Sequence, residues 1–213
     1  MDLVADLVHR VEERRGDQAR FAVAIDGPDA AGKTTLANAL SARLGTGALH
    51  VSMDAFHHLR AIRHRRGRAS AAGYFEDAFD HATAISELLV PFRDGAPTVR
   101  VASTDYDTDV PVAPTAAVGP RSVLVVDGVF LQIPLLRRCW DFVVYLRVSP
   151  AISRERGMAR DALRGDSLDD LDVRYRERYL PGQARYRAEI DPESAADLLV
   201  DMTDPAKPFV VRG

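Results

Sequence analysis

The stretch that decides the fold is Gly27-Pro28-Asp29-Ala30-Ala31-Gly32-Lys33-Thr34, which fits the pattern G-x-x-x-x-G-K-[ST] at every fixed position. In such a phosphate-binding loop, the backbone N–H groups point at a phosphate, and the dipole of the following helix adds to the attraction. The lysine reaches the β- and γ-phosphates, and the threonine hydroxyl is placed to bind Mg²⁺. We therefore expect ATP and Mg²⁺ to bind here, with contacts from Gly27, Asp29, Ala30, Ala31, Gly32, Lys33, Thr34 and Thr35.

The residues on either side of this loop have the pattern that a P-loop requires. Residues 21–25 form a short apolar run that predicts a buried strand. After the loop, residues 33–44 place their apolar side chains on one helical face, and Gly45 stands where that helix should end. A strand before the loop and a helix after it favour a true P-loop over a turn that happens to contain glycine.

The rest of the chain continues the alternation of strands and helices. Further strands are predicted at 49–52, 122–126, 142–148 and 195–200, and helices at 3–15, 78–90, 151–163 and 168–190. We expect Pro91 to end the second helix and Pro181-Gly182 to break the last one. Residues 97–114 predict a small hairpin or extended excursion. The pattern indicates an α/β protein with the three-layer P-loop NTPase fold: a mainly parallel five-stranded sheet, helices on both faces and a small lid.

Composition limits the class of protein further. The chain of 213 residues is 46% hydrophobic and 28% charged, enough for a single domain over 1–213 that includes an N-terminal helix within 1–18. A net charge of -3 argues against nucleic acid or an anionic membrane as a partner. The apolar runs fall far short of the roughly 20 residues that a membrane span needs. The acidic residues near the N-terminus are untypical of a signal peptide, and the single cysteine suits a reducing compartment, so we expect a cytoplasmic protein.

Two acidic residues follow predicted strands, at the sheet edge where ligands bind in such folds. Asp127 ends the strand 122–126, where P-loop proteins hold Mg²⁺ with a carboxylate, so Thr34 and Asp127 are the predicted metal-binding pair. The alternative for Asp127 is an ordinary turn residue. Asp54 lies just past the strand 49–52 and could accept the proton of a hydroxyl that attacks the γ-phosphorus. Its alternative role is that of a helix N-cap.

Arginines recur on the predicted helix 151–163. Arg156 and Arg160 are four residues apart and therefore share one face. Arginines that reach over a triphosphate neutralise the charge that develops during phosphoryl transfer, so we predict catalytic roles for Lys33, Asp54, Arg156 and Arg160. The arginines would belong to a lid over about 154–168, with Gly157 and Gly165 as hinges. The alternative is a solvated helix face.

The segment 57–68 carries five arginines and no acidic residue. It could be a solvated loop, or a clamp for an anionic acceptor, because arginine forks match phosphate and carboxylate groups. No aromatic residues alternate with the arginines, which argues against nucleic-acid binding. A metal site at His57, His58 and His64 would lack the carboxylate or cysteine partner that such sites usually contain.

Taken together, these segments resemble the uridine kinase branch of the P-loop kinases, a group that includes pantothenate kinase and phosphoribulokinase, from about Phe21 to Val211. Residues 51–57 resemble the segment that carries the catalytic aspartate of uridine kinases, and residues 77–80 resemble the end of their DHPDAFD segment. Residues 125–130 resemble the EGIF-type segment, with Asp127 in place of glutamate. The resemblance implies an acceptor-binding region over about 57–112 and a substrate-contacting set of Asp54, His57, Tyr74, Asp77, Phe79 and Arg164.

The departures from that family fall on the acceptor side. Where uridine kinases hold the base with a tyrosine and a histidine, this chain has Ala102 and Asp107. The expected activity is transfer of the γ-phosphate of ATP to an alcohol acceptor, with a nucleoside as the leading candidate. Alternatives are a kinase of a nucleoside monophosphate, pantothenate or a sugar, and a P-loop regulatory NTPase. The expected partner is thus a small-molecule phosphate acceptor, and homo-oligomerisation is left open.

Overall fold

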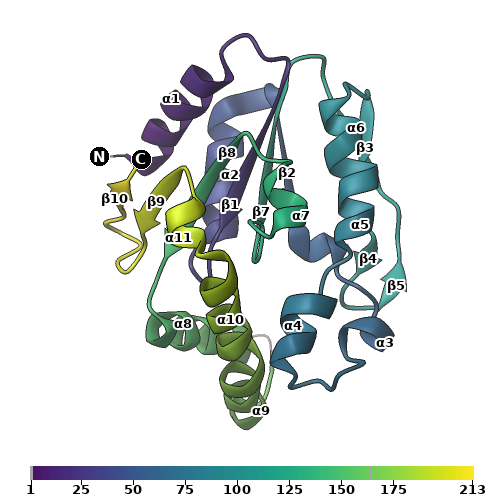
Figure 1. Ribbon diagram of the computed structural model, residues 1–213, viewed down its shortest axis with the longest axis vertical. Helices are drawn as coiled ribbons and strands as arrows, with labels where there is room; N and C mark the ends of the chain where they lie inside the picture. Colours follow the sequence, from purple (N-terminus) through teal and green to yellow (C-terminus); the bar gives the residue numbers. More distant parts are fainter. Residues whose placement is uncertain (1, 164) are drawn as a thin grey trace.

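A six-stranded sheet forms the centre of the computed structural model, which describes residues 2–163 and 165–213 (Figure 1). The strand order is β10-β9-β8-β1-β7-β2. Five neighbouring strands run parallel, and they confirm all five strands that the sequence predicts: β1 (Arg20–Asp26), β2 (Ala48–Ser52), β7 (Ser122–Gly128), β8 (Phe142–Arg147) and β9 (Leu198–Asp201). The sixth strand, β10 (Phe209–Arg212), pairs antiparallel with β9 at the edge.

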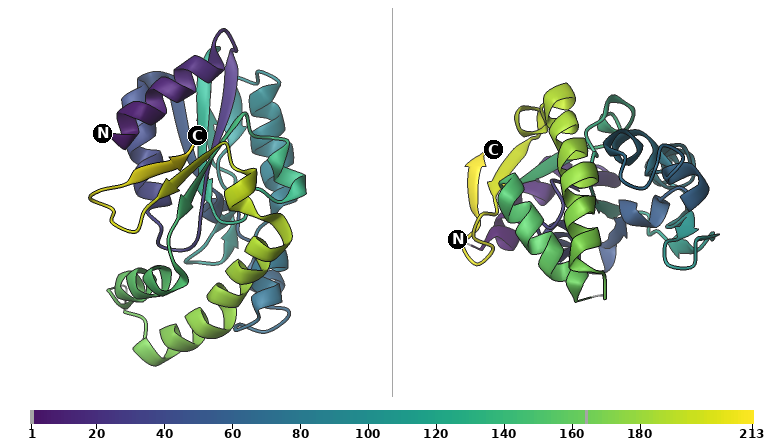
Figure 2. Two further views of the ribbon diagram at one scale, coloured as in Figure 1. Left: turned by 60° about the vertical axis from the view of Figure 1, so that its left-hand side comes forward. Right: turned by 90° about the horizontal axis from the view of Figure 1, so that it is seen from below.

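Helices cover both faces of the sheet, so the predicted three-layer α/β architecture is confirmed. Because side chains alternate along a strand, Phe21, Val23 and Ile25 of β1 face one side. That side is covered by α1 (Leu3–Arg15) and α2 (Lys33–Leu44). Ala22 and Ala24 face the opposite side. That side is covered by α4 (Ala71–Asp77), the helix from α5 (His81–Thr83) to α6 (Val90–Arg93), α7 (Pro134–Arg137) and α10 (Leu180–Ile190). Figure 2 (left) shows the sheet between these two groups of helices.

Beyond the carboxyl ends of the parallel strands lie two groups of short elements. One group follows β2 and contains a 3₁₀ turn (Met53–Phe56), α3 (Arg60–Arg63) and α4. The other follows β8 and contains α8 (Pro150–Ala162), α9 (Leu168–Val173) and α10, which packs against α4 (Figure 1). Two small antiparallel pairs, β3 (Thr98–Arg100) with β6 (Thr115–Ala117) and β4 (Thr104–Asp105) with β5 (Val110–Pro111), form the excursion predicted at 97–114. None of the described helices has the length and apolar character that a membrane span requires.

The two prolines expected to interrupt helices lie inside continuous ones, so this part of the prediction is wrong. Pro91 lies in a helix that runs through α5 (His81–Thr83), a π-helical turn (Ala84–Leu89) and α6 (Val90–Arg93). Pro181 follows a second π-helical turn (Arg174–Tyr179) that joins α9 to α10. A proline ring normally clashes with the carbonyl one turn earlier. The wider π turn before each proline rearranges these hydrogen bonds, and the helix continues.

His81, the first residue of α5, should make folding sensitive to acid. Burial lowers the pKa of His81 to about 4, helped by the charge of His58 and opposed by Asp80. The pKa in an unfolded chain is about 6.5, so between about pH 6.5 and 4 the unfolded state binds a proton that the folded state does not. We expect the free energy of unfolding to fall as the pH drops through this window, by up to about 1.4 kcal/mol per pH unit from this residue.

Urea unfolding of the wild type and of His81→Phe over this pH range checks the expectation. The variant should have the flatter profile, because the other titrating groups are common to both proteins. Parallel profiles would show that His81 contributes nothing to the acid sensitivity.

Candidate active site

The P-loop lies between β1 and α2, at the carboxyl edge of the sheet. Gly27 has a φ of 152°, and a Cβ atom on this residue would lie 2.6 Å from the carbonyl oxygen of Leu146 in β8. Only glycine therefore lets the loop pack so closely against the neighbouring strand. The Lys33 ammonium donates to the Pro28 carbonyl at 2.7 Å, so the lysine side chain folds back over the P-loop.

A buried carboxylate holds the base of the loop. Asp26, the last residue of β1, accepts the backbone N–H of Gly27 (2.8 Å), the amide of Gln132 (3.0 Å) and the hydroxyl of Tyr186 (2.5 Å). Burial raises the pKa of Asp26, and these three hydrogen bonds oppose that rise. Sequence reasoning missed Gln132 and Tyr186, because nothing local to residue 132 or 186 signals a contact with β1.

The predicted metal-binding pair is brought together. The Thr34 hydroxyl donates to Asp127 Oδ2 at 2.6 Å, and Asp127 lies within β7 rather than in a turn. Burial alone would raise the pKa of Asp127, but the hydrogen bonds from His50 and Thr34 and the charge of Lys33 hold it below its usual value. The carboxylate is thus ionised near neutral pH. A hydroxyl beside a carboxylate is a donor set that suits Mg²⁺.

His50 is a site residue that the sequence analysis did not identify. Its Nε2 atom lies 2.7 Å from Asp127 Oδ1, and its Nδ1 atom lies 2.9 Å from Asn38 Oδ1 of α2. The only local signal was a polar ring within the short strand 49–52. By bridging β2, β7 and α2, His50 fixes the orientation of the Asp127 carboxylate.

Asp54 lies in the 3₁₀ turn that follows β2. The Ser52 hydroxyl accepts the N–H of Asp54 (3.4 Å) and caps this turn, so the alternative that Asp54 is itself the N-cap is wrong. The Asp54 side chain is exposed and makes no hydrogen bond or ion pair with the described residues. Burial raises the pKa of Asp29 in the P-loop, and the charge of Asp54 adds to that rise.

Three residues of the predicted acceptor-binding set contact Asp54, one another or the P-loop. The Nδ1 atom of His57 lies 2.7 Å from the backbone oxygen of Asp54, and its ring centroid lies 4.4 Å from that of Phe79. The Tyr74 hydroxyl donates to the Asp29 carboxylate at 3.0 Å. Burial is the main cause that raises the pKa of Asp29, and the charge of Lys33 and the Tyr74 hydroxyl counteract it.

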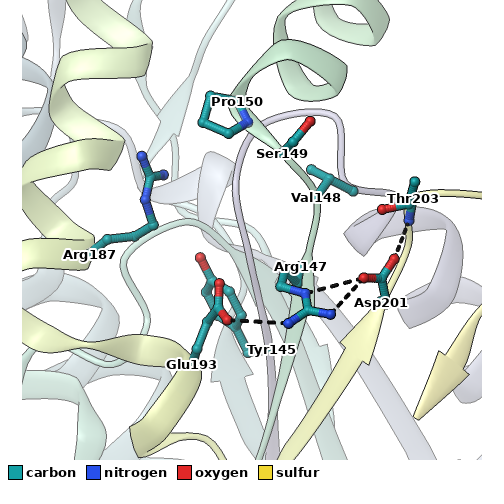
Figure 3. A pocket seen from close by; sticks show the side chains of 9 residues that line it. All are labelled: Tyr145, Arg147, Val148, Ser149, Pro150, Arg187, Glu193, Asp201 and Thr203. Carbon is teal, nitrogen blue, oxygen red and sulfur yellow. Dashed lines mark hydrogen bonds and ion pairs between the residues drawn. The ribbon is translucent and has the colours of Figure 1, made fainter. Parts of the chain in front are cut away.

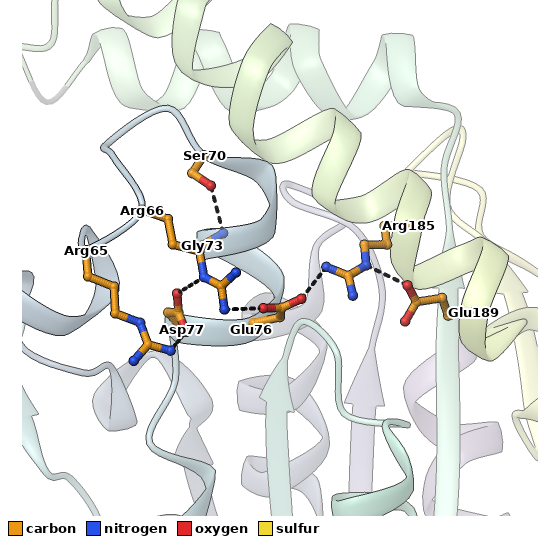
Figure 4. Close-up of polar contacts among 8 residues, drawn as sticks. All are labelled: Arg65, Arg66, Ser70, Gly73, Glu76, Asp77, Arg185 and Glu189. Carbon is orange, nitrogen blue, oxygen red and sulfur yellow. Dashed lines mark hydrogen bonds and ion pairs between the residues drawn. The ribbon is translucent and has the colours of Figure 1, made fainter.

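Asp77, a further member of that set, has both carboxylate oxygens engaged by arginines (Figure 4). Arg65 pairs with Oδ1, and the Nε of Arg66 donates to Oδ2 at 2.8 Å. Arg66 also pairs with Glu76 (2.6 Å), which pairs in turn with Arg185 of α10 (2.5 Å). Two of the five arginines of segment 57–68 therefore hold that segment to α4, and Glu76 and Arg185 join α4 to α10. A contact between Asp77 and an acceptor stays a prediction.

The arginines of α8 do not all face the P-loop. Arg160 donates to Asp161 at 2.8 Å, and its charge opposes the rise that burial causes in the pKa of Asp29. Arg156 instead donates to the backbone oxygens of Met202 (2.9 Å) and Thr203 (2.7 Å), in the loop after β9. The predicted contact of Arg164 lies outside the described residues.

The proposed hinge at Gly157 has a different explanation. The hydroxyl of Tyr175 occupies the place where a Cβ atom would stand, so this glycine lets α8 approach the π-helical turn between α9 and α10 closely. The same hydroxyl donates to Asp161 at 3.2 Å. Gly165 has a φ of 94° and fits a turn between α8 and α9.

A cavity of about 350 Å³ lies at the carboxyl ends of β8 and β9 (Figure 3). Arg147 crosses it and donates to Asp201 at 2.8 Å, while Arg187 reaches in from α10. Thr203, whose carbonyl binds Arg156, forms part of its rim. The cavity is therefore separate from Asp54 and adjoins the loop after β9.

Within residues 2–163 and 165–213, no group of three or more His, Cys, Asp or Glu side chains is arranged to hold a metal ion. The histidine metal site considered for segment 57–68 is therefore not formed. A Mg²⁺ ion would depend on Thr34 and Asp127, with phosphate and water oxygens completing its shell.

The chain is similar to known proteins over most of its length. Residues 22–204 match the family described as "Phosphoribulokinase / Uridine kinase family". A uridine kinase from Halobacterium salinarum is 25% identical over 197 residues, which cover 86% of this chain and 85% of that protein. One from Chloroflexus aurantiacus is 27% identical over 160 residues, covering 72% and 74%. The solved structure of a possible uridine kinase from Bacillus stearothermophilus has a TM-score of 0.73 and 24% identity, covering 92% of this chain and 96% of that one.

The anchor of the P-loop can be tested with Tyr186→Phe. This change removes the hydroxyl that donates to Asp26 and accepts the N–H of Gln132 at 3.0 Å, and it leaves the buried carboxylate with fewer partners. We expect a loss of about 1–3 kcal/mol in the free energy of unfolding, measured with urea. Tyr106→Phe, at an exposed position, is the matched control and should change stability little. Equal stability of all three proteins would contradict the anchoring role.

Proposed function

This chain belongs to the phosphoribulokinase/uridine kinase family, and on that premise we propose that it transfers the γ-phosphate of ATP to a hydroxyl group of a small-molecule acceptor. The observation that carries the proposal is the Asp54 carboxylate, exposed and without a partner among the described residues. Ser52, just before it, is the register partner of Asp127 across β2 and β7. A candidate base thus follows the strand beside the metal-binding pair.

The donor half of the site would hold ATP through the P-loop. Its backbone N–H groups and the α2 dipole attract the phosphates, and Lys33 would exchange the Pro28 carbonyl for phosphate oxygens. Thr34 and Asp127 would hold Mg²⁺, which when bound neutralises charge on the β- and γ-phosphates. Arg156 is better placed to fix the loop after β9, whereas Arg160 lies near enough to Asp29 to act on the transferring group.

In the proposed reaction, the acceptor oxygen attacks the γ-phosphorus in line with the leaving group. The bond from that phosphorus to the β,γ-bridging oxygen breaks, ADP leaves, and the hydroxyl proton passes to the Asp54 carboxylate. His57 would position this base, because its ring holds the turn through the Asp54 backbone oxygen.

The names of the relatives make a nucleoside the first acceptor to test. ADP release with Mg²⁺-ATP, measured across nucleosides, their monophosphates, pantothenate and sugars, separates the candidate functions. A kinase is stimulated by its acceptor, whereas a regulatory NTPase of the same fold would hydrolyse ATP at a rate that none of these compounds changes.

Replacing the base should remove turnover without removing nucleotide binding. We expect Asp54→Asn to lower kcat roughly 100- to 10,000-fold, because the amide cannot accept the proton. The measurement is ADP release together with calorimetric binding of an ATP analogue, which should be unchanged. Asp94→Asn, at an exposed turn after α6, is the control with the same charge change. Wild-type kcat in Asp54→Asn would rule Asp54 out as the base.

His50 should influence nucleotide binding only through the metal. We expect His50→Ala to weaken Mg²⁺-dependent binding of an ATP analogue by about 10- to 100-fold, because Asp127 loses the ring that orients it. Binding measured without Mg²⁺ should be the same as in the wild type, and the exposed His9→Ala serves as control. An equal loss with and without Mg²⁺ would point to a general defect of the loop instead.

A further inference from the structure

One arginine of segment 57–68 differs from its neighbours. Arg63, in α3, is only 3% exposed, and its Nε and Nη1 atoms are buried without a hydrogen-bond partner among the described residues. Its Nη2 atom lies 3.5 Å from Asp109, which already accepts the N–H of Arg60 at 2.9 Å. Arg65 and Arg66, by contrast, are paired with acids. Arg63 is therefore a buried cation with two unused donors and a shared counter-charge.

A second buried arginine contacts the end of segment 57–68. Arg178 is 6% exposed, and its Nη1 atom donates to the carbonyl oxygens of Arg68 (3.4 Å) and Ser70 (3.2 Å). It has no carboxylate partner among the residues that the structure describes. Burial lowers the pKa of Arg178, and the charge of Arg63 contributes to the decrease. Arg178 is thus a second buried cation, and it contacts the segment that carries Arg63.

Short contacts connect this pair of cations to the candidate base. The Arg63 guanidinium lies 4.2 Å from the ring centroid of Tyr106, and the His57 ring lies 4.9 Å from the same centroid. His57 in turn contacts the Asp54 backbone oxygen. Arg178 lies over Tyr74 at 5.3 Å, and Tyr74 bonds to Asp29 of the P-loop. Both arginines therefore border the region where the acceptor must lie.

Neither buried arginine has a carboxylate of its own among the described residues, since Arg63 shares Asp109 with Arg60 and Arg178 has none. A buried cation is costly unless an anion and hydrogen bonds compensate it, and an aromatic ring beneath it compensates only in part. The free Nε–H and Nη1–H groups of Arg63 lie on different edges of its guanidinium group, and each can donate to an oxygen of a phosphate or carboxylate. A neutral acceptor would add no negative charge beside either arginine.

We propose that the acceptor is an anionic alcohol, whose phosphate or carboxylate group binds Arg63 and Arg178 while its hydroxyl faces Asp54. This rests on the proposed function, since it names the acceptor class of the same site. It excludes the free nucleosides that the relatives' names suggest as acceptors, because a free nucleoside carries neither a phosphate nor a carboxylate group. The acceptor must therefore come from a reaction that leaves a phosphate ester or a carboxylate on an alcohol.

The first test is direct binding, which does not require the acceptor to be known. Protein saturated with Mg²⁺ and a non-hydrolysable ATP analogue, which occupies the P-loop, is titrated with inorganic phosphate and, separately, with acetate. We expect saturable binding of one of them, weakened about tenfold or more in Arg63→Met. Arg68→Met is the matched control, since Arg68 is exposed and the net charge changes equally. Binding of acetate alone indicates a carboxylate acceptor, and binding of phosphate indicates a phosphate ester.

Stability provides an independent measurement. If Arg63 serves a ligand, Arg63→Met should be at least as stable as the wild type without anions, and the anion should raise the Tm of the wild type only. A purely structural arginine would instead lower the Tm on replacement, with no effect of the anion on either protein.

The outcomes separate the two proposals. Absence of anion binding, or equal binding by Arg63→Met, overturns the anionic acceptor even if the chain is a kinase. Failure of the Mg²⁺–ATP analogue to bind at all overturns the proposed function itself. The inference would also be refuted if a neutral alcohol such as glycerol stimulated ADP release as strongly as its phosphate ester, glycerol 3-phosphate.

Discussion

The site depends on one buried carboxylate at the end of β1. Asp26 receives the first N–H of the P-loop, the Gln132 amide and the Tyr186 hydroxyl, so a single side chain joins the loop to the segment after β7 and to α10. The loop must present its N–H groups inward, and glycine gives its backbone little stiffness of its own. The rigidity therefore comes from this contact and from the close packing of Gly27 on β8. Helix α10 also carries Arg185, which extends the same connection to α4.

The distribution of paired and unpaired charges decides which side chains remain available to ligands. Arg65, Arg66 and Asp77 satisfy one another and fasten α4, and Arg154 pairs with Asp172 between α8 and α9. Around the acceptor region, the exposed Asp54 carboxylate has no partner among the described residues, and the buried Arg63 has two guanidinium nitrogens without one. An acceptor with a hydroxyl at one end and an anion at the other would complement both.

Pattern alone predicted the central sheet because its evidence is local. Each of the five parallel strands is a short apolar run, and the P-loop fixes the order strand, loop, helix around residue 27. The misjudged features depend on contacts or hydrogen bonds that periodicity does not encode. Pro91 and Pro181 remain inside helices because π turns precede them, and the short β10 forms because β9 offers it an edge.

By itself the sequence determined the fold class, the P-loop and the pairing of Thr34 with Asp127, since the motif and the strand ends specify which residues reach the carboxyl edge of a parallel sheet. Only the tertiary structure decided which side chains contact one another. It brought His50 to Asp127 and Tyr186 to Asp26, turned Arg156 toward the loop after β9, and separated Arg63 from four other arginines of one segment. The reason is physical: residue type and spacing fix what a side chain can do, but burial and neighbouring charge decide whether its capacity is already used.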